Sequence, residues 1–218
     1  MQQRVATPAP EAAPETPGIV IGNHTHKYTA KNPAIRWLTE RWVGNLERVM
    51  DKIAAETSGP DIQALEVGCG EGVISDKLHR RWPGSVGLDL PDAGLRADWK
   101  AYDGPHFLHA DAHRLPFVDD KFDVIISVEV LEHLTDPEQG LREIARVGRG
   151  HIVLSVPREP IFRSCNFVAG RYVKDLGNTP GHLNHWSTRS FVKFVSQVAD
   201  VRDVSKPFPW TTVWATLR

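Results

Sequence analysis

The chain of 218 residues is long enough for one domain with a sizeable hydrophobic core. Hydrophobic residues make up 41% and charged residues 24%, as in water-soluble globular proteins, and no apolar run reaches transmembrane length. The net charge of −1 argues against a nucleic acid or a membrane surface as the partner.

Two features predict a cytoplasmic protein. Cys69 and Cys165 have the spacing of neither a metal site nor a disulfide framework, which suits a reducing compartment. The first residues also lack the basic segment and apolar core of a secretory signal.

The beginning of the chain predicts a tail followed by a long helix. Residues 1–18 carry four prolines among alanines and glutamates and predict a disordered tail, so the domain covers 19–218. Asn32 and Pro33 then form a helix start. Apolar residues at helical spacing extend the predicted helix over 33–56: Ile35, Leu38, Trp42, Leu46, Val49 and Ile53.

Strand and helix patterns alternate after this helix, which predicts an α/β fold with a parallel sheet covered on both faces. The predicted strands lie near 62–67, 85–89, 106–109, 122–128 and 150–156, and the helices near 72–82, 92–100 and 137–147. The pattern breaks over 158–186. Ser187 then caps a helix to about residue 198, and strands follow over 201–204 and 211–217.

The stretch 64–72, Ala-Leu-Glu-Val-Gly-Cys-Gly-Glu-Gly, predicts a strand, a tight turn and a helix. Glycine allows the backbone to approach a ligand closely, and the helix that follows directs free N–H groups toward it. Asp89 ends the next apolar run, where a carboxylate can accept hydrogen bonds from both hydroxyls of a ribose. These features together predict a nucleoside-binding site.

The glycine spacing distinguishes two kinds of nucleoside cofactor. In the dinucleotide fingerprint G-x-G-x-x-G the third glycine would stand at Val73, whereas here it stands one place earlier, at Gly72. The spacing G-x-G-x-G behind Glu66 instead resembles the first motif of class I S-adenosylmethionine-dependent methyltransferases of type 11. Residues 109–117, 122–128 and 129–134 resemble three further motifs of that family, so the resemblance covers roughly 62–157.

The resemblance implies a Rossmann-like, doubly wound sheet of seven strands, mostly parallel with an antiparallel last strand. It also implies S-adenosylmethionine as the cofactor. The glycines would pass under its methionine part, and Asp111 would accept a hydrogen bond from the adenine amino group, although Asp111 can also be a simple turn residue. The implied cofactor residues are Tyr28, Glu66, Gly68, Gly70, Gly72, Asp89, Leu90, Asp111 and Ala112.

The spacing E-x-x-E-H, formed by Glu129, Glu132 and His133, lies just after the fourth predicted strand, where ligands bind in open α/β sheets. It resembles a motif of the ubiquinone-pathway O-methyltransferases and of small-RNA 2′-O-methyltransferases, whose glutamates and histidine hold a divalent ion. His182 and His185 offer a late histidine to such a site, here for Mg²⁺ or Mn²⁺.

Two other interpretations of this motif remain open. His133, Glu129, His182 or His185 could act as a base without a metal, or the motif could merely begin the following helix, where the dipole favours carboxylates. The segment 158–186 is expected to form the wall that faces the substrate.

The preferred function is O-methylation of a hydroxyl on a small molecule, such as a phenol, a sugar or another secondary metabolite. Three alternatives are an RNA 2′-O-methyltransferase, a protein that binds the cofactor without transfer, and a dehydrogenase. The first helix and the closing strands could form a homodimer surface.

Overall fold

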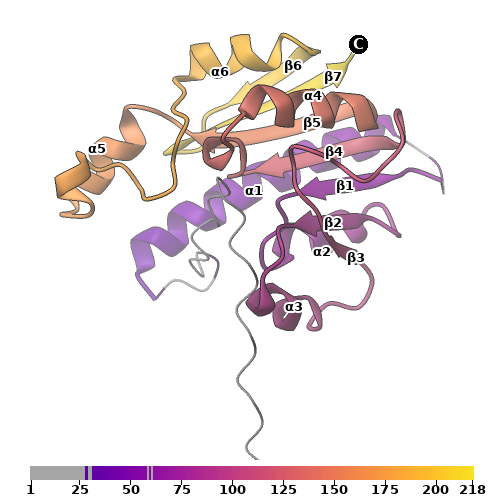
Figure 1. The fold of residues 1–218 in the computed structure, drawn as a ribbon, viewed down its shortest axis with the longest axis horizontal. Helices are drawn as coiled ribbons and strands as arrows, with labels where there is room; N and C mark the ends of the chain where they lie inside the picture. The colour runs from indigo at the N-terminus through magenta and orange to yellow at the C-terminus, as the bar shows by residue number, and fades with distance from the viewer. Residues whose placement is uncertain (1–27, 29–30, 58, 60) are drawn as a thin grey trace, which may run out of the picture.

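Seven strands form one sheet in the order β3-β2-β1-β4-β5-β7-β6 (Figure 1). This computed structural model describes residues 28, 31–57, 59 and 61–218, so the predicted tail lies outside the described residues. Only the two pairings of β7 are antiparallel, as expected for a doubly wound sheet with a reversed last strand. The strands are β1 (Ala64–Val67), β2 (Val86–Asp89), β3 (His106–His109), β4 (Phe122–Val128), β5 (Gly148–Pro157), β6 (Ala199–Ser205) and β7 (Trp210–Leu217).

Helices cover both faces of this sheet (Figure 1). Asn32 caps the first helix by accepting from the N–H of Ala34 at 2.9 Å, and Ser187 caps the last by accepting from the N–H of Ser190 at 3.2 Å. The helices are α1 (Pro33–Glu56), α2 (Val73–His79), α3 (Ala93–Trp99), α4 (Pro137–Val147), α5 (Ile161–Val168) and α6 (Thr188–Val195), with 3-10 turns η2 (Leu131–His133) and η3 (Val173–Asp175). Among the described residues, no helix is both long and apolar enough to cross a membrane.

Alternate residues of the central strands build the hydrophobic core on the two faces. On one face, Val124 and Ile126 of β4 pack with α1 and α2, and Trp42 of α1 stacks on Trp210 with ring centroids 5.2 Å apart. On the other face, Ile125 of β4 packs with α4 and α6. This period of two is the ordinary geometry of a strand buried on both faces.

The sheet has its topological switch point between β1 and β4, where open α/β sheets form a ligand crevice. From β1 the chain builds outward to β2 and β3 on one side, whereas β4 and β5 extend the sheet on the other side. Ligands bind at such a switch point, outside the carboxyl ends of the strands. The loops after β1 and β4, which carry the glycine turn and the E-x-x-E-H motif, meet there.

The structure differs from the sequence prediction mainly after β5. The irregular segment predicted over 158–186 contains α5 and η3, which project from the body (Figure 1). Helix α2 ends at His79 rather than near residue 82, in keeping with Pro83, which disfavours helical conformation just before it. Strand β5 is longer than predicted at both ends, because Gly148 pairs with Phe122 of β4 and Pro157 pairs with Trp210 of β7.

Candidate active site

The three glycines of the turn all adopt positive φ angles, of 77° at Gly68, 48° at Gly70 and 89° at Gly72. A Cβ added at Gly68 would collide with the side chain of Val130, so the turn lies directly against the loop after β4. At Gly70, no atom of another described residue beyond its two chain neighbours lies within 4 Å of the position of an added Cβ. This side of the turn therefore leaves room for a ligand to approach the backbone.

Asp89 holds the glycine turn from the end of β2. Its Oδ2 accepts from the N–H of Gly70 at 2.7 Å, and its Oδ1 accepts from the N–H of Leu90 at 2.7 Å. On the other side, the indole of Trp99 donates to the carbonyl of Gly70 at 2.8 Å. Sequence reasoning missed Trp99 because no local pattern marks a helix residue that reaches a turn 29 positions earlier.

Glu66 lies buried beneath the same turn. Its carboxylate accepts a hydrogen bond from the hydroxyl of Ser75 on α2 at 2.5 Å. Tyr28 lies nearby: burial raises the pKa of its phenol well above the usual value, and the negative charges of Glu66 and Glu129 raise it further. Tyr28 thus stays protonated and can donate a hydrogen bond at neutral pH.

Asp111 and Ala112 follow β3 in a tight turn. Oδ1 of Asp111 accepts from the backbone N–H of His113 at 2.9 Å and contacts Nδ1 of that ring at 2.7 Å. The N–H of Asp136, which caps α4, donates to Nε2 of the same ring at 3.3 Å, so Nδ1 carries the proton. His113 therefore links the predicted adenine turn to α4, and Asp111 serves as a turn residue whatever else it binds.

The structure brings together three of the residues proposed for chemistry. One ligand atom from each of Glu132, His133 and His182 lies within 4.8 Å of the other two. The rings of His133 and His182 meet edge to face, with centroids 4.9 Å apart. Nδ1 of His133 lies 2.9 Å from the carbonyl oxygen of Gly181, which can only accept. Nδ1 therefore carries a proton, and in the neutral form of the ring Nε2 is the nitrogen that can accept one.

Asn184 fastens the late histidine segment to η2. Its side-chain amide donates to the carbonyls of Leu131 at 3.2 Å and Leu134 at 2.6 Å. The backbone N–H groups of Leu183 and Asn184 both donate to the carbonyl of Glu132, at 2.8 and 3.0 Å. This set of bonds brings residues about fifty positions apart into one cluster. Nothing in the local sequence indicated Asn184.

Burial separates the roles of the two clustered histidines. Burial lowers the pKa of His182 to about 3, with a further contribution from the imidazoles of His133 and His185. His182 is therefore neutral at ordinary pH and a weak proton acceptor. His133 is less buried, so it is the better placed base of the pair.

Glu129 and His185 lie outside this cluster of ligand atoms. Glu129 adopts a positive φ of 62° directly after β4, which places its carboxylate near Tyr28 instead. Nε2 of His185 lies 2.8 Å from Oδ1 of Asn178, and burial lowers the pKa of this imidazole, followed by the charge of Arg163. The structure thus places these two predicted residues beside other partners.

Three features meet at the crevice: the open space over Gly70, the carboxylate at the end of β2 and the buried carboxylate of Glu66. A carboxylate at the end of the second strand is where open α/β proteins bind the ribose of a nucleoside, so this geometry is compatible with the predicted nucleoside site.

Comparison with known proteins indicates what kind of domain this is. Residues 65–154 match the family described as a methyltransferase domain. The chain therefore contains a methyltransferase domain, which argues against the dehydrogenase alternative. Relatives named as S-adenosylmethionine-dependent methyltransferases indicate S-adenosylmethionine as the cofactor.

Two curated relatives show the range of the family. The chain is 32% identical over 123 residues to a "Probable S-adenosylmethionine-dependent methyltransferase" of Mycolicibacterium smegmatis, covering 56% of this chain and 47% of the relative. It is 28% identical over 138 residues to a ubiquinone biosynthesis O-methyltransferase of Ruegeria pomeroyi, covering 59% of this chain and 54% of the relative. The chain thus spans about half the length of these relatives.

Solved structures share the fold. Magnesium protoporphyrin IX methyltransferase from Synechocystis PCC 6803, which has S-adenosylhomocysteine bound, superposes with a TM-score of 0.65. The match covers 88% of this chain and 91% of that chain at 16% identity, so the likeness concerns the fold.

Proposed function

We propose that the protein transfers the methyl group of S-adenosylmethionine to a hydroxyl oxygen of a small molecule. The observation that carries the proposal is the cluster of Glu132, His133 and His182, in which Nδ1 of His133 donates to the carbonyl of Gly181. Relatives named as ubiquinone biosynthesis O-methyltransferases support oxygen as the acceptor atom. Phenols and sugars have suitable hydroxyls.

The residues of the chain perform two tasks in this reaction: they position the two reactants, and they accept the proton of the hydroxyl. When bound, S-adenosylmethionine supplies an electrophilic methyl group on positively charged sulfur. The acceptor oxygen forms a bond to that carbon, the carbon–sulfur bond breaks, and its electron pair stays on sulfur. The hydroxyl proton passes to Nε2 of His133.

The cluster stabilises the charge that His133 acquires. The carbonyl of Gly181 continues to accept from Nδ1, and the carboxylate of Glu132 lies within the same cluster. Glu66, Asp89 and the glycine turn would hold the cofactor on the other side of the crevice. Positioning both reactants in one site contributes much of the rate in such a transfer.

A metal-assisted variant of this function rests on the same cluster. One carboxylate and two imidazoles, from Glu132, His133 and His182, form a donor set suited to a divalent transition ion. Such an ion would lower the pKa of a bound acceptor hydroxyl and would take the place of His133 as the aid to deprotonation.

Calorimetry and kinetics distinguish the two variants. We would titrate Mn²⁺ into protein saturated with S-adenosylhomocysteine, and into Glu132→Gln. Heat of binding that disappears in the variant supports the metal site, whereas no heat in the unaltered protein leaves His133 as the base.

Turnover tests the proposed function itself. With caffeic acid and catechol as acceptors, we expect His133→Asn to lower kcat by about a hundredfold or more without weakening binding of S-adenosylhomocysteine. The control is His185→Asn, which changes a histidine outside the cluster and should stay within about threefold. Unaltered turnover in His133→Asn contradicts the assignment. Cofactor binding with no transfer to any acceptor supports a binding protein instead.

A further inference from the structure

The arm, which we define as residues 161–177, exposes an unusual amount of apolar surface. It contains α5 and η3 and projects at the left of Figure 1. Four large apolar side chains of the arm are strongly exposed: Phe167 at 47%, Val168 at 87%, Val173 at 48% and Leu176 at 68%. Contiguous apolar exposure of this kind marks an interaction surface.

The arm also carries an excess of positive charge. Arg171 and Lys174 are exposed and Arg163 is half-buried, whereas Asp175 is the only acid within the arm. The chain as a whole has a net charge of −1, so this local excess is invisible in the composition. Cations interspersed with exposed apolar side chains are typical of segments that lie on anionic lipid surfaces.

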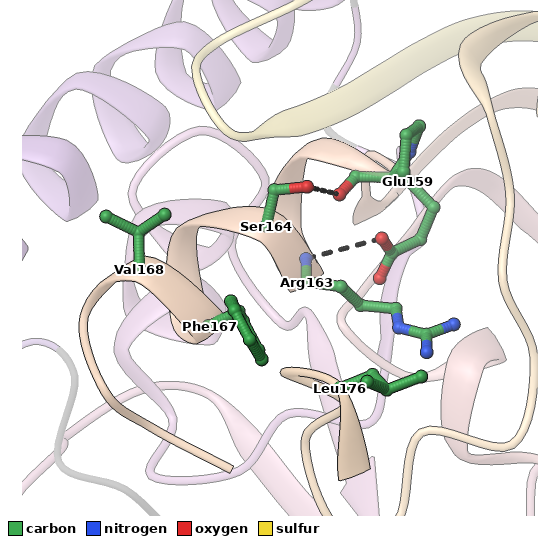
Figure 2. A pocket seen from close by; sticks show the side chains of 7 residues that line it. Glu159, Arg163, Ser164, Phe167, Val168 and Leu176 are labelled. Atoms are coloured by element: carbon green, nitrogen blue, oxygen red, sulfur yellow. Dashed lines mark hydrogen bonds between the residues drawn. The ribbon is translucent and has the colours of Figure 1, made fainter. Parts of the chain in front are cut away.

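A groove of about 490 Å³ opens along the arm. Figure 2 shows Phe167 and Leu176 beside each other in its lining, with Val168 extending outward from α5. At its base, burial raises the pKa of Glu159, against the opposing influence of Arg163, so this acid carries negative charge less readily than an exposed carboxyl. The groove is therefore a mainly apolar cleft beside cationic side chains.

We propose that the arm docks on an anionic phospholipid bilayer, with Phe167, Val168 and Leu176 entering the interfacial region. A second copy of the chain fits this surface less well. In a symmetric dimer the same patch faces itself, which would bring Arg171 and Lys174 of both copies together. Anionic headgroups instead complement these charges.

Docking on a bilayer would place the acceptor cluster beside the lipid. The inner side of α5 carries Phe162, whose ring centroid lies 5.7 Å from that of His182. Because one short helix contacts both the cluster and the docked surface, acceptors with apolar tails could reach the site from the bilayer. This last step rests on the proposed function, whereas docking itself does not.

Vesicle co-sedimentation tests docking without any activity. The probes are vesicles of phosphatidylcholine alone and of equal parts phosphatidylcholine and phosphatidylglycerol. We expect partitioning onto the anionic vesicles that weakens as salt rises, and little binding to the neutral ones. Lys174→Glu should reduce partitioning by about an order of magnitude, because it reverses one charge at the surface.

Matched substitutions separate the arm from the general surface. Val168→Ser should lower partitioning by about tenfold. Val118→Ser, which alters a side chain 72% exposed in another loop, and Lys206→Glu should leave it unchanged. Binding of S-adenosylhomocysteine should be equal in all four, which shows that they are folded.

Three outcomes overturn the proposal. They are no binding to anionic vesicles, equal binding to both vesicle types, and equal loss in the variants and their controls. Concentration-dependent dimers in light scattering that Val168→Ser abolishes, together with no vesicle binding, assign the arm to self-association instead. Vesicle binding with no methyl transfer would leave docking standing and contradict only the proposed function.

Discussion

The two sides of the crevice are built in different ways. On the cofactor side, Asp89 at the end of β2 holds the turn that follows β1. Asp89 and Trp99 both form hydrogen bonds with the backbone of Gly70. On the acceptor side, η2 and the segment around Asn184 are far apart in the chain and are joined by side-chain and loop hydrogen bonds.

This difference indicates which properties a substitution on each side of the site should affect. The cofactor side depends on backbone conformations that only glycine adopts easily, whereas the acceptor side depends on the fit of one long loop against a short turn. We therefore expect substitutions in the glycine turn to affect folding and cofactor binding together, and those in the late segment to affect the histidine cluster and stability without changing cofactor binding.

Gly68→Ala should have the largest effect. The new methyl group would collide with Val130 at a residue whose φ is already positive, so we expect a loss of about 3 kcal/mol or more in unfolding free energy. Chemical denaturation measures it. Gly44→Ala, in the middle of α1 with nothing within 4 Å of the new Cβ, is the control and should be neutral or stabilising. Equal effects at both positions would show that the turn is not tightly packed.

The pH dependence of stability should report His182. Its pKa is about 3 in the folded protein and near 6.5 when unfolded, so the unfolded state binds more protons between these values. Stability should therefore fall as pH drops below about 6.5, and by about pH 4 His182 should account for up to about 3 kcal/mol of that loss. His182→Gln should flatten the profile by this amount. Parallel profiles would contradict a buried, neutral His182.

Asn184→Ala tests the connection on the acceptor side. It removes two hydrogen bonds to carbonyls of the 131–134 turn, which should cost about 1–2 kcal/mol of unfolding free energy. Calorimetry should show unchanged binding of S-adenosylhomocysteine, since the glycine turn is untouched. A large loss of cofactor affinity would show that the two sides are not independent.

Trp99→Phe should have the smallest effect. Phenylalanine keeps an aromatic ring against Phe107 but loses the hydrogen bond to Gly70, which we expect to cost about 1 kcal/mol. Binding of S-adenosylhomocysteine should weaken a few-fold, whereas Trp186→Phe, on the face covered by α6, should leave it unchanged. No change in affinity would remove Trp99 from the support of the turn.

The sequence predicted the parts of the molecule that local patterns encode. The apolar run of β4, the cap at Asn32 and the glycine spacing each reflect a conformation set within a few residues, and the structure has them where predicted. The family resemblance added the reversed β7. Helix α5 was not predicted, because its eight residues, flanked by prolines and glycines, are too few to show a helical period.

The sequence indicated most residues of the candidate site, but not which of them come together. The motif spacing indicated Glu132 and His133, and His182 was one of two late histidines. That His182 and not His185 meets them depends on the bonds made by Asn184, which are tertiary contacts. The support from Trp99 and His113 depends equally on packing between distant elements.

The placement of β7 between β5 and β6 leaves β3 and β6 as the two borders of the sheet. Strand β3 has only four residues, and β6 carries Asp200, Arg202 and Asp203 beside an irregular register. Short or charged borders resist the addition of a foreign strand. The protein should therefore resist amyloid-like stacking at high concentration, and any assembly of two copies should use helices or loops rather than a continuous intermolecular sheet.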